Sequence, residues 1–193
     1  MLRNLIILIL SIICSYSTLY AQDQKILLIG ECNKSGTDKM LQYLNKNGKI
    51  HLLSENNINI TEDNISSYPI IFICNNQYLQ LSSNQINYIA KHIKRGGFFI
   101  IDNITSDYTY SLFIQQLMPE FEKEAIQIEN IFNNMIFDLA FEENPFESNA
   151  IFINEKIVLL GIKDFSLLDA WNNDDEEELL RLGVNIIFYY LTR

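Results

Sequence analysis

The sequence predicts a single α/β domain in which a doubly wound, mostly parallel sheet carries helices on both faces. Short apolar segments without helical periodicity alternate with amphipathic segments, as strands and helices do in such sheets. The length of 193 residues fits one domain, and a hydrophobic content of 48% supplies a full core. We therefore expect one domain that folds on its own, without internal repeats.

Four strands are expected in the first half of the chain. The first and third are runs of apolar residues with no helical spacing, which is typical of buried strands covered on both faces. Pro69 is tolerated in the third because it lies among the first residues of that strand. Residues 54–67 are rich in asparagine, so we expect a loop there with at most one turn of helix. The expected strands span residues 25–30, 50–53, 68–74 and 98–102.

Helices are expected between these strands and at the carboxyl end of the chain. The best-defined helix begins at a capping box formed by Ser82 and Gln85, continues through apolar residues at helical spacing, and ends at Gly96. The others are expected after the first strand, over residues 106–118 before Pro119, and from residue 174 to residue 191, where five acidic residues occupy the positive end of the helix dipole.

Glycines and small polar residues predict how two of these helices begin, end or pack. In the helix after the first strand, Ser35 or Thr37 is expected to cap the first turn. Gly48 lies where a left-handed residue ends a helix. Gly183 lies inside the last helix, where it costs about 1 kcal/mol relative to alanine. The simplest reason for that glycine is a close approach of the helix to a strand.

The pattern is looser in the second half of the chain. Residues 125–128 and 135–137 are strand candidates. Residues 150–153 and 156–160 flank Asn154 and Glu155 in the manner of a hairpin, or of a strand that follows a short turn.

The first 21 residues are expected to form an export signal. Arg3 supplies the positive start, and an apolar run over residues 5–13 follows. This run is about half the roughly 20 residues that a bilayer-spanning helix needs. We expect cleavage before Gln22, a domain over residues 22–193, and a periplasmic or secreted protein. The alternatives are an uncleaved N-terminal membrane anchor and lipidation at Cys14.

The two cysteines of the mature chain are candidates for a disulfide. Cys32 follows the first strand and Cys74 ends the third. In a flavodoxin-like strand order these strands are neighbours about 4.8 Å apart, which is within disulfide reach. An oxidising compartment would permit the bond. The alternative is that both residues are small buried hydrophobes.

Charge and motif spacing argue against several classes of ligand. Acidic residues outnumber basic residues by 24 to 14, which gives a net charge of −10 and disfavours a nucleic-acid partner. Residues 30–37 contain two glycines without the spacing of a phosphate-binding loop, so a nucleotide is not supported. Two histidines and two mature cysteines, all far apart in sequence, make a poor zinc site. We assign no cofactor and no metal.

The carboxyl ends of the strands are the expected place for a ligand in a doubly wound sheet. Acidic and amide side chains gather there, and their oxygens would suit Mg²⁺ or Ca²⁺. The simpler interpretation, which we favour, is that such side chains cap the following helices. The candidate rim consists of Glu31, Asn75, Asn76, Asp102 and Asn103, joined by Asp164 and Asp169 if the strand over residues 156–160 is parallel.

Three segments carry a resemblance to a known family. They read INYIAKHIKRGGFFIIDN (residues 86–103), GIKDFSLLDAW (161–171) and LLRLGVNIIFYYLTR (179–193). Residues 26–193 thus resemble DUF4159, an uncharacterised bacterial domain whose fold is similar to class I glutamine amidotransferases and ThuA-like proteins. The resemblance implies a cell-envelope setting with ATPase and von Willebrand-type partners.

The resemblance also marks individual residues. Family members usually carry an Asp-Asp pair where this chain has Asp102 and Asn103, and they tend to carry an Asp-His-Pro motif that is missing around residues 129–131. Trp171 falls in the segment before the last helix that resembles the family. We add Trp171 to the candidate rim as a binding aromatic, although packing of its loop against the sheet is the favoured interpretation.

A search for the Cys-His-Glu triad of the amidotransferases fails. Cys74 ends a strand, but residues 75–77 lack the glycines of a nucleophile elbow. No histidine follows His92, where the base should lie. We therefore expect a non-catalytic binding or interaction module of the envelope, with envelope proteins as partners and contact with the membrane only through an uncleaved signal. The alternative is an enzyme of unknown substrate that uses the rim around Asp102 and Asn103, with a divalent cation.

Overall fold

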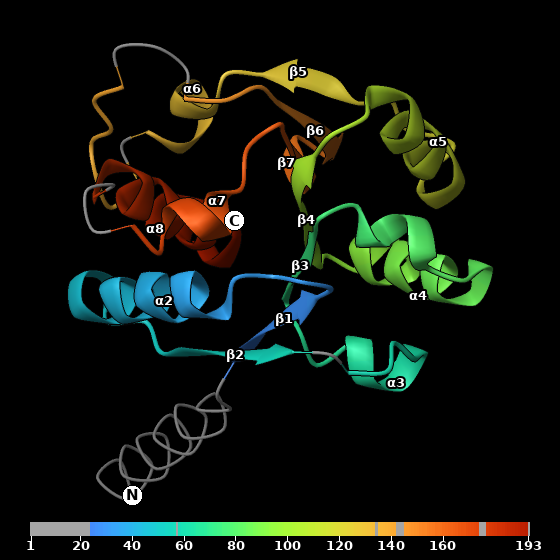
Figure 1. Ribbon diagram of the computed structural model, residues 1–193, viewed down its shortest axis with the longest axis horizontal. Helices are drawn as coiled ribbons and strands as arrows, with labels where there is room; N and C mark the ends of the chain where they lie inside the picture. The colour runs from blue at the N-terminus through green and yellow to red at the C-terminus, as the bar shows by residue number, and fades with distance from the viewer. Residues whose placement is uncertain (1–23, 57, 134, 142–144, 174–176, 193) are drawn as a thin grey trace, which may run out of the picture.

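One seven-stranded sheet runs through the centre of the molecule and carries helices on both faces (Figure 1). The computed structural model describes residues 24–192 apart from residues 57, 134, 142–144 and 174–176. The strands are β1 (Gln24–Ile29), β2 (Leu52–Asn56), β3 (Ile70–Cys74), β4 (Phe98–Ile104), β5 (Glu124–Ile126), β6 (Ser148–Ile153) and β7 (Lys156–Lys163). The helices are α2 (Lys34–Gly48), α3 (Glu62–Ile65), η1 (Gln77–Gln80), α4 (Ser83–Lys94), α5 (Asp107–Leu117), α6 (Ile128–Phe132), α7 (Leu167–Ala170) and α8 (Glu177–Thr192).

The strand order is β2-β1-β3-β4-β7-β6-β5. All neighbours from β2 to β7 are parallel, whereas β6 and β5 are added antiparallel. The predicted fold class, a mostly parallel α/β sheet with helices on both faces, is therefore confirmed. The parallel strands present their carboxyl ends at one edge of the sheet, which is the edge where a doubly wound fold binds ligands.

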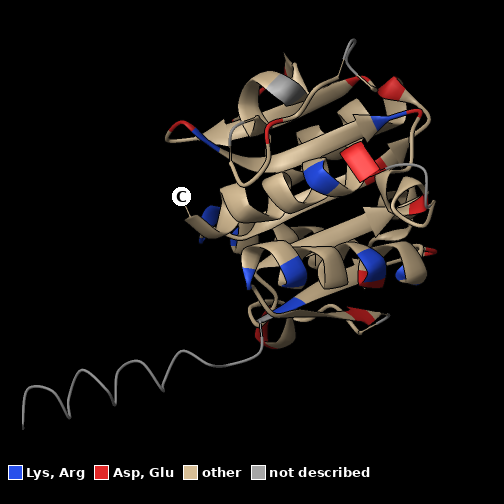
Figure 2. Cartoon of the chain, turned by 90° about the vertical axis from the view of Figure 1, so that its left-hand side faces the viewer, with Lys and Arg blue, Asp and Glu red and all other residues tan. Residues whose placement is uncertain are grey.

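Each face of the sheet has its own hydrophobic core. Side chains alternate between the two cores along a strand, so Phe72 packs on the side of α2 and α8, while Ile71 and Ile73 pack on the side of α4 and α5. Figure 1 shows the same division, with α2, α7 and α8 on one side of the central strands and α3, α4 and α5 on the other. The outer side of α2 and α8 carries interspersed acidic and basic residues (Figure 2), including the pairs Lys34–Asp38 and Arg181–Glu177.

The ends of α2 differ from the prediction. Its N-cap is Asn33, whose side-chain oxygen accepts from the backbone N–H of Gly36 at 3.0 Å, rather than Ser35 or Thr37. The helix therefore starts before the serine and threonine can act as caps. At the other end the left-handed residue is Lys49 (φ 55°), whose N–H bonds to Asn45 O. The helix thus runs through Gly48 and ends one residue later than expected.

The predicted capping box of α4 is confirmed. Ser82 accepts from the N–H of Gln85, and the Gln85 side chain accepts from the N–H of Ser82. The single helical turn expected within residues 54–67 is α3, which has a second capping box formed by Thr61 and Asn64. The second strand, expected over residues 50–53, runs instead over Leu52–Asn56 because pairing with β1 sets its register.

The hairpin around Asn154 and Glu155 is also confirmed. Both residues have left-handed backbone conformations, with φ of 50° and 65°, which match the twist of a two-residue hairpin. The hairpin pairs β6 with β7 antiparallel, and β7 returns beside β4 in parallel orientation.

The strand expected over residues 135–137 is not formed, and this segment is irregular. Its backbone is instead bonded to Asn185, a fully buried residue of α8. Asn185 Oδ1 accepts from the N–H groups of Ile136 and Phe137, at 3.1 and 3.0 Å. Asn185 Nδ2 donates to the carbonyls of Phe132 and Phe137, both at 2.8 Å. One side chain thus satisfies three backbone groups of this segment and the carbonyl of Phe132 at the end of α6.

Gly183 in α8 makes a close approach, but to Trp171 rather than to a strand. A Cβ at this position would lie 2.5 Å from an indole carbon of Trp171. The indole is fully buried, donates from Nε1 to Leu179 O at 2.8 Å and meets Phe72 edge to face. The glycine therefore makes room for the largest aromatic side chain of this core.

We expect Gly183→Ala to lower the free energy of unfolding by about 2 kcal/mol, because overpacking a filled core outweighs the gain in helix propensity. Urea unfolding followed by circular dichroism measures this change. Adding Trp171→Phe to Gly183→Ala removes the clashing atoms, so the second substitution should cost less in the alanine background than in the wild type. A more stable Gly183→Ala variant would contradict this packing.

The expected export signal, including Cys14, lies in residues 1–21, outside the described residues. Within the described ranges, no helix has both the length and the apolarity needed to cross a bilayer.

Candidate functional site at the carboxyl edge of the sheet

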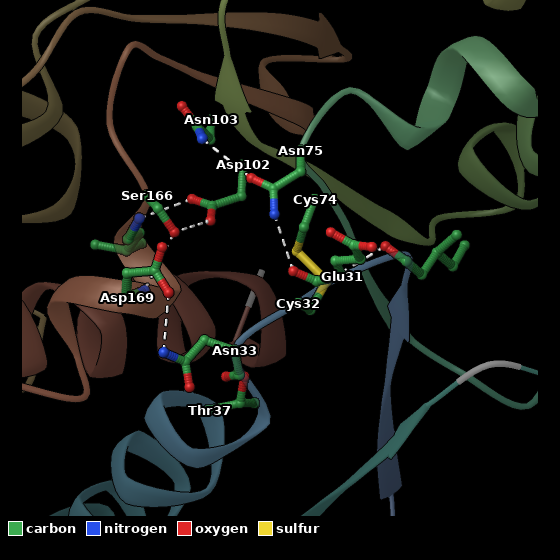
Figure 3. The surroundings of a disulfide bond; sticks show 12 residues. Glu31, Cys32, Asn33, Thr37, Cys74, Asn75, Asp102, Asn103, Ser166 and Asp169 are labelled. Carbon is green, nitrogen blue, oxygen red and sulfur yellow. Dashed lines mark hydrogen bonds between the residues drawn. A yellow bond between two sulfur atoms is a disulfide. The ribbon is translucent and has the colours of Figure 1, made fainter.

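A disulfide joins the carboxyl ends of β1 and β3 (Figure 3). Cys32 lies just beyond β1, and Cys74 is the last residue of β3. The two strands are parallel neighbours, and Ile29 pairs with Ile73, so the chain brings the cysteines to the same edge. Their sulfur atoms are 2.02 Å apart and their Cα atoms 5.3 Å apart. The bond therefore ties the first loop of the edge to the second.

Asn75 and Asn103 extend this connection to β4. Both adopt left-handed backbone conformations, with φ of 51° and 61°, which asparagine tolerates better than most residues. Asn103 Nδ2 donates to Asn75 Oδ1 at 3.0 Å, and Asn75 Nδ2 donates to the backbone carbonyl of Glu31 at 3.0 Å. Figure 3 shows these amides bridging neighbouring strand ends. Asn103 thus links the end of β4 to the end of β3, and Asn75 links the end of β3 to the loop after β1.

Asn76 forms a parallel connection one residue further on. Its Nδ2 donates to Thr105 Oγ1 at 2.6 Å, and its Oδ1 accepts from Tyr78 OH at 3.0 Å. The turn after β3 is thereby bonded to the residue that follows β4. Like Asn75 and Asn103, this asparagine stabilises the arrangement of the strand ends through its side-chain hydrogen bonds.

Asp102 is buried and bonded to the start of α7. Its side chain is 1% exposed, Ser166 Oγ donates to Oδ2 at 2.8 Å, and the N–H of Leu167 donates to Oδ1 at 2.8 Å. Burial raises the pKa of Asp102 to about 6, and the bonds from Ser166 and Leu167 only partly offset this effect. The carboxyl group thus holds the loop after β7 against β4, as a helix-capping side chain does.

The raised pKa of Asp102 predicts a pH-dependent stability. Because the folded-state pKa lies above the unfolded value of 3.8, the folded chain binds the proton more tightly. The stabilisation that this tighter proton binding gives the folded chain is complete below the unfolded pKa, and it is lost as the pH rises through about 6. Asp102→Asn keeps an acceptor for Leu167 without a titrating group. We therefore expect the wild type to lose free energy of unfolding relative to the variant between about pH 4 and 7, as measured by urea unfolding across that range. A constant difference would contradict the raised pKa.

Asn33 and Ser166 also contribute to this edge, and neither was among the sequence candidates. Asn33, the cap of α2, donates from Nδ2 to Asp169 Oδ1 at 2.9 Å, and Ser166 Oγ accepts from the N–H of Asp169. These bonds link the start of α2 to α7. The Ser-x-x-Asp spacing of residues 166–169 is a capping signal that could have identified part of this link.

The remaining sequence candidates contribute no side chain to the bonds described above, and Glu31 takes part only through its backbone carbonyl. The side chains of Glu31 and Asp164 are exposed, and Trp171 does not reach the rim because it is fully buried beneath α8. Asp164 has a left-handed backbone (φ 50°), and its N–H bonds to Ile104 O. Among the described residues, no three His, Cys, Asp or Glu side chains are arranged to hold a metal ion.

Both histidines lie at the opposite edge of the sheet. His51 directly precedes β2, and His92 lies in the last turn of α4, where its ring packs on Gly97 just before β4 begins. Burial and the nearby Arg95 lower the pKa of His92. Neither imidazole is therefore placed to act as a base beside Cys74 or Asp102.

Comparison with known proteins identifies the family. The model of DUF4159, a domain of unknown function, matches residues 30–191. The chain belongs to the DUF4159 family. The match covers the whole carboxyl edge, including the disulfide and Asp102. No curated protein matches this DUF4159 chain.

Proposed function

We propose that this DUF4159 chain is an exported, non-catalytic binding or protein-interaction module of the bacterial cell envelope. The observation that carries the proposal is that Asp102 is buried and that its carboxyl group is already hydrogen-bonded. An ionisable group at the carboxyl edge would be the natural acid or base of an enzyme, but this carboxyl group accepts bonds from Ser166 and Leu167 and is 1% exposed. The edge is thus organised to hold the chain together.

Export is supported by the disulfide together with the export signal expected from residues 1–21. Disulfides persist in oxidising compartments and are rare in the cytosol. We also infer that the fold descends from the amidotransferase-like group, with the catalytic elbow replaced. The residues after Cys74 are left-handed asparagines, and Cys74 itself is bonded to Cys32.

An interaction role is supported by the outer surface of α5. Tyr108 and Leu112 lie one helical turn apart, and their side chains are 74% and 42% exposed. Side chains four residues apart in a helix lie side by side, so these two form a small apolar surface next to the carboxyl edge. Apolar side chains grouped in this way favour contact with a protein partner.

The proposal is tested in two steps in cells that produce the full chain. Fractionation should place the protein outside the cytoplasm with Gln22 as its first residue, and a full-length cytoplasmic chain would contradict export. A photoreactive phenylalanine analogue is then placed at Tyr108, with Gln42 on the far side of the sheet as the control position. A discrete crosslinked envelope protein from position 108 alone supports the interaction role, whereas no product at 108, or the same products at both positions, contradicts it.

A further inference from the structure

An open cavity of about 590 Å³, lined mostly by charged and polar residue types, lies beside the carboxyl edge, between α5 and strands β5 to β7. Ala125 pairs with Asn149, and Asn149 pairs with Gly161, so these residues point to one face of the sheet. Lys163 lies two residues after Gly161 and shares that face. The cavity has the size of a site for a small molecule.

Two lysines and two carboxylates line this cavity. Lys163 Nζ bonds to Asp107 Oδ2 at 2.9 Å and to Glu147 Oε2 at 2.6 Å, while its side chain is only 19% exposed. These two carboxylates raise the pKa of Lys163. Lys123 Nζ lies 4.8 Å from the centre of the Tyr110 ring and 4.0 Å from Asp107 Oδ1. The cavity thus presents fixed charges of both signs with no net charge.

An amide donor lies in the same wall. Asn149 is 7% exposed, and its Oδ1 accepts from the fully buried Tyr110 OH at 2.6 Å. Gly161 leaves space for this pair, because a Cβ there would lie 2.5 Å from the Tyr110 oxygen. Within the described part of the chain, Asn149 Nδ2 has no hydrogen-bond partner. Nδ2 is not among the fully buried side-chain atoms that lack a partner, so it is open to the cavity and can donate to a ligand acceptor.

We propose that this cavity binds a small zwitterion, a molecule with one carboxylate and one ammonium group, such as a free amino acid or a dipeptide. The ligand carboxylate accepts from Asn149 Nδ2, from Lys123 and from the N–H of Lys163 that Asp107 and Glu147 leave unused. The ligand ammonium lies at the mouth of the cavity beside Glu147, which is 78% exposed. A simple anion or cation would satisfy only one half of this charge pattern. The proposal does not depend on export.

The test compares glycine and diglycine with acetate and ethylammonium at equal ionic strength, using the chain from Gln22 labelled with ¹⁵N. Saturable amide shifts that centre on residues 123–127, 147–149 and 163, produced by at least one zwitterion and not by the single-charge probes, support the site. Absence of saturable binding, binding of acetate as tight as that of the zwitterions, or shifts centred elsewhere would overturn it.

The Glu147→Gln variant distinguishes binding at this cavity from a general effect of the net charge of the protein. Glu147 is exposed, so the variant should fold, and losing a charged acceptor for the ligand ammonium should weaken binding about tenfold. Glu122→Gln changes the net charge by the same amount at a nearby exposed position outside the cavity lining. Equal effects of the two substitutions, or none from Glu147→Gln, would contradict the proposal.

Discussion

Replacing Cys32 and Cys74 by alanine is expected to lower the free energy of unfolding by about 4 kcal/mol. The bond closes a loop across a sequence separation of 42 residues, so breaking it restores much conformational freedom to the unfolded chain. The substitution also removes the covalent link between the first two loops of the carboxyl edge. Urea unfolding of the oxidised wild type and of the double variant measures the difference.

Reduction provides the matched control for this prediction. Wild type treated with dithiothreitol should unfold at nearly the same urea concentration as the double variant, and the reductant should leave the variant unchanged. A difference below about 1 kcal/mol between the oxidised and reduced wild type would show that the bond contributes little to stability.

Replacing Asn185 by aspartate is expected to cost about 4 kcal/mol or to prevent folding, because a carboxylate oxygen would then face the carbonyls of Phe132 and Phe137. Two buried acceptors would lose their donor, and a charge would be buried without a partner. The loss should grow as the pH rises and the new carboxyl group ionises. Thermal and urea unfolding between pH 4 and 8 measure both effects.

Asn87→Asp is the control for Asn185→Asp. Asn87 is exposed in the middle of α4, and its replacement adds the same charge without burying it. We expect a change of less than about 0.5 kcal/mol there. A small effect at Asn185 would mean that the segment around Ile136 and Phe137 does not depend on the four bonds to this side chain.

Local signals in the sequence predicted most of the fold. The apolar runs of β1, β3 and β4 are buried on both faces, so their composition identifies them without any knowledge of their neighbours. The capping box at Ser82 and the turn at Asn154 and Glu155 each depend only on residues within a few positions of one another, so the local sequence is enough to predict them. Strand order alone places Cys32 near Cys74, and the structure joins these two residues.

What the sequence could not predict depends on contacts between distant segments. The bonds from Asn185 to residues 132–137 cross about 50 positions of the chain, so an irregular segment with apolar residues resembled a strand. The burial of Asp102 depends on α7, more than 60 residues later. The residues Asp107, Asn149 and Lys163 of the open cavity come from three elements, two of which are strands with weak or ambiguous sequence patterns.

The measurement that tests export and the organisation of the carboxyl edge most directly is the state of the two cysteines in intact cells that produce the full chain. Thiols are blocked with one alkylating reagent, the protein is reduced, and new thiols are labelled with a second reagent before mass spectrometry of the peptides that contain Cys32 and Cys74. We expect the second label on both peptides. The first label on both peptides would mean that the cysteines are reduced in the cell, which would contradict an oxidising location and the disulfide at this edge.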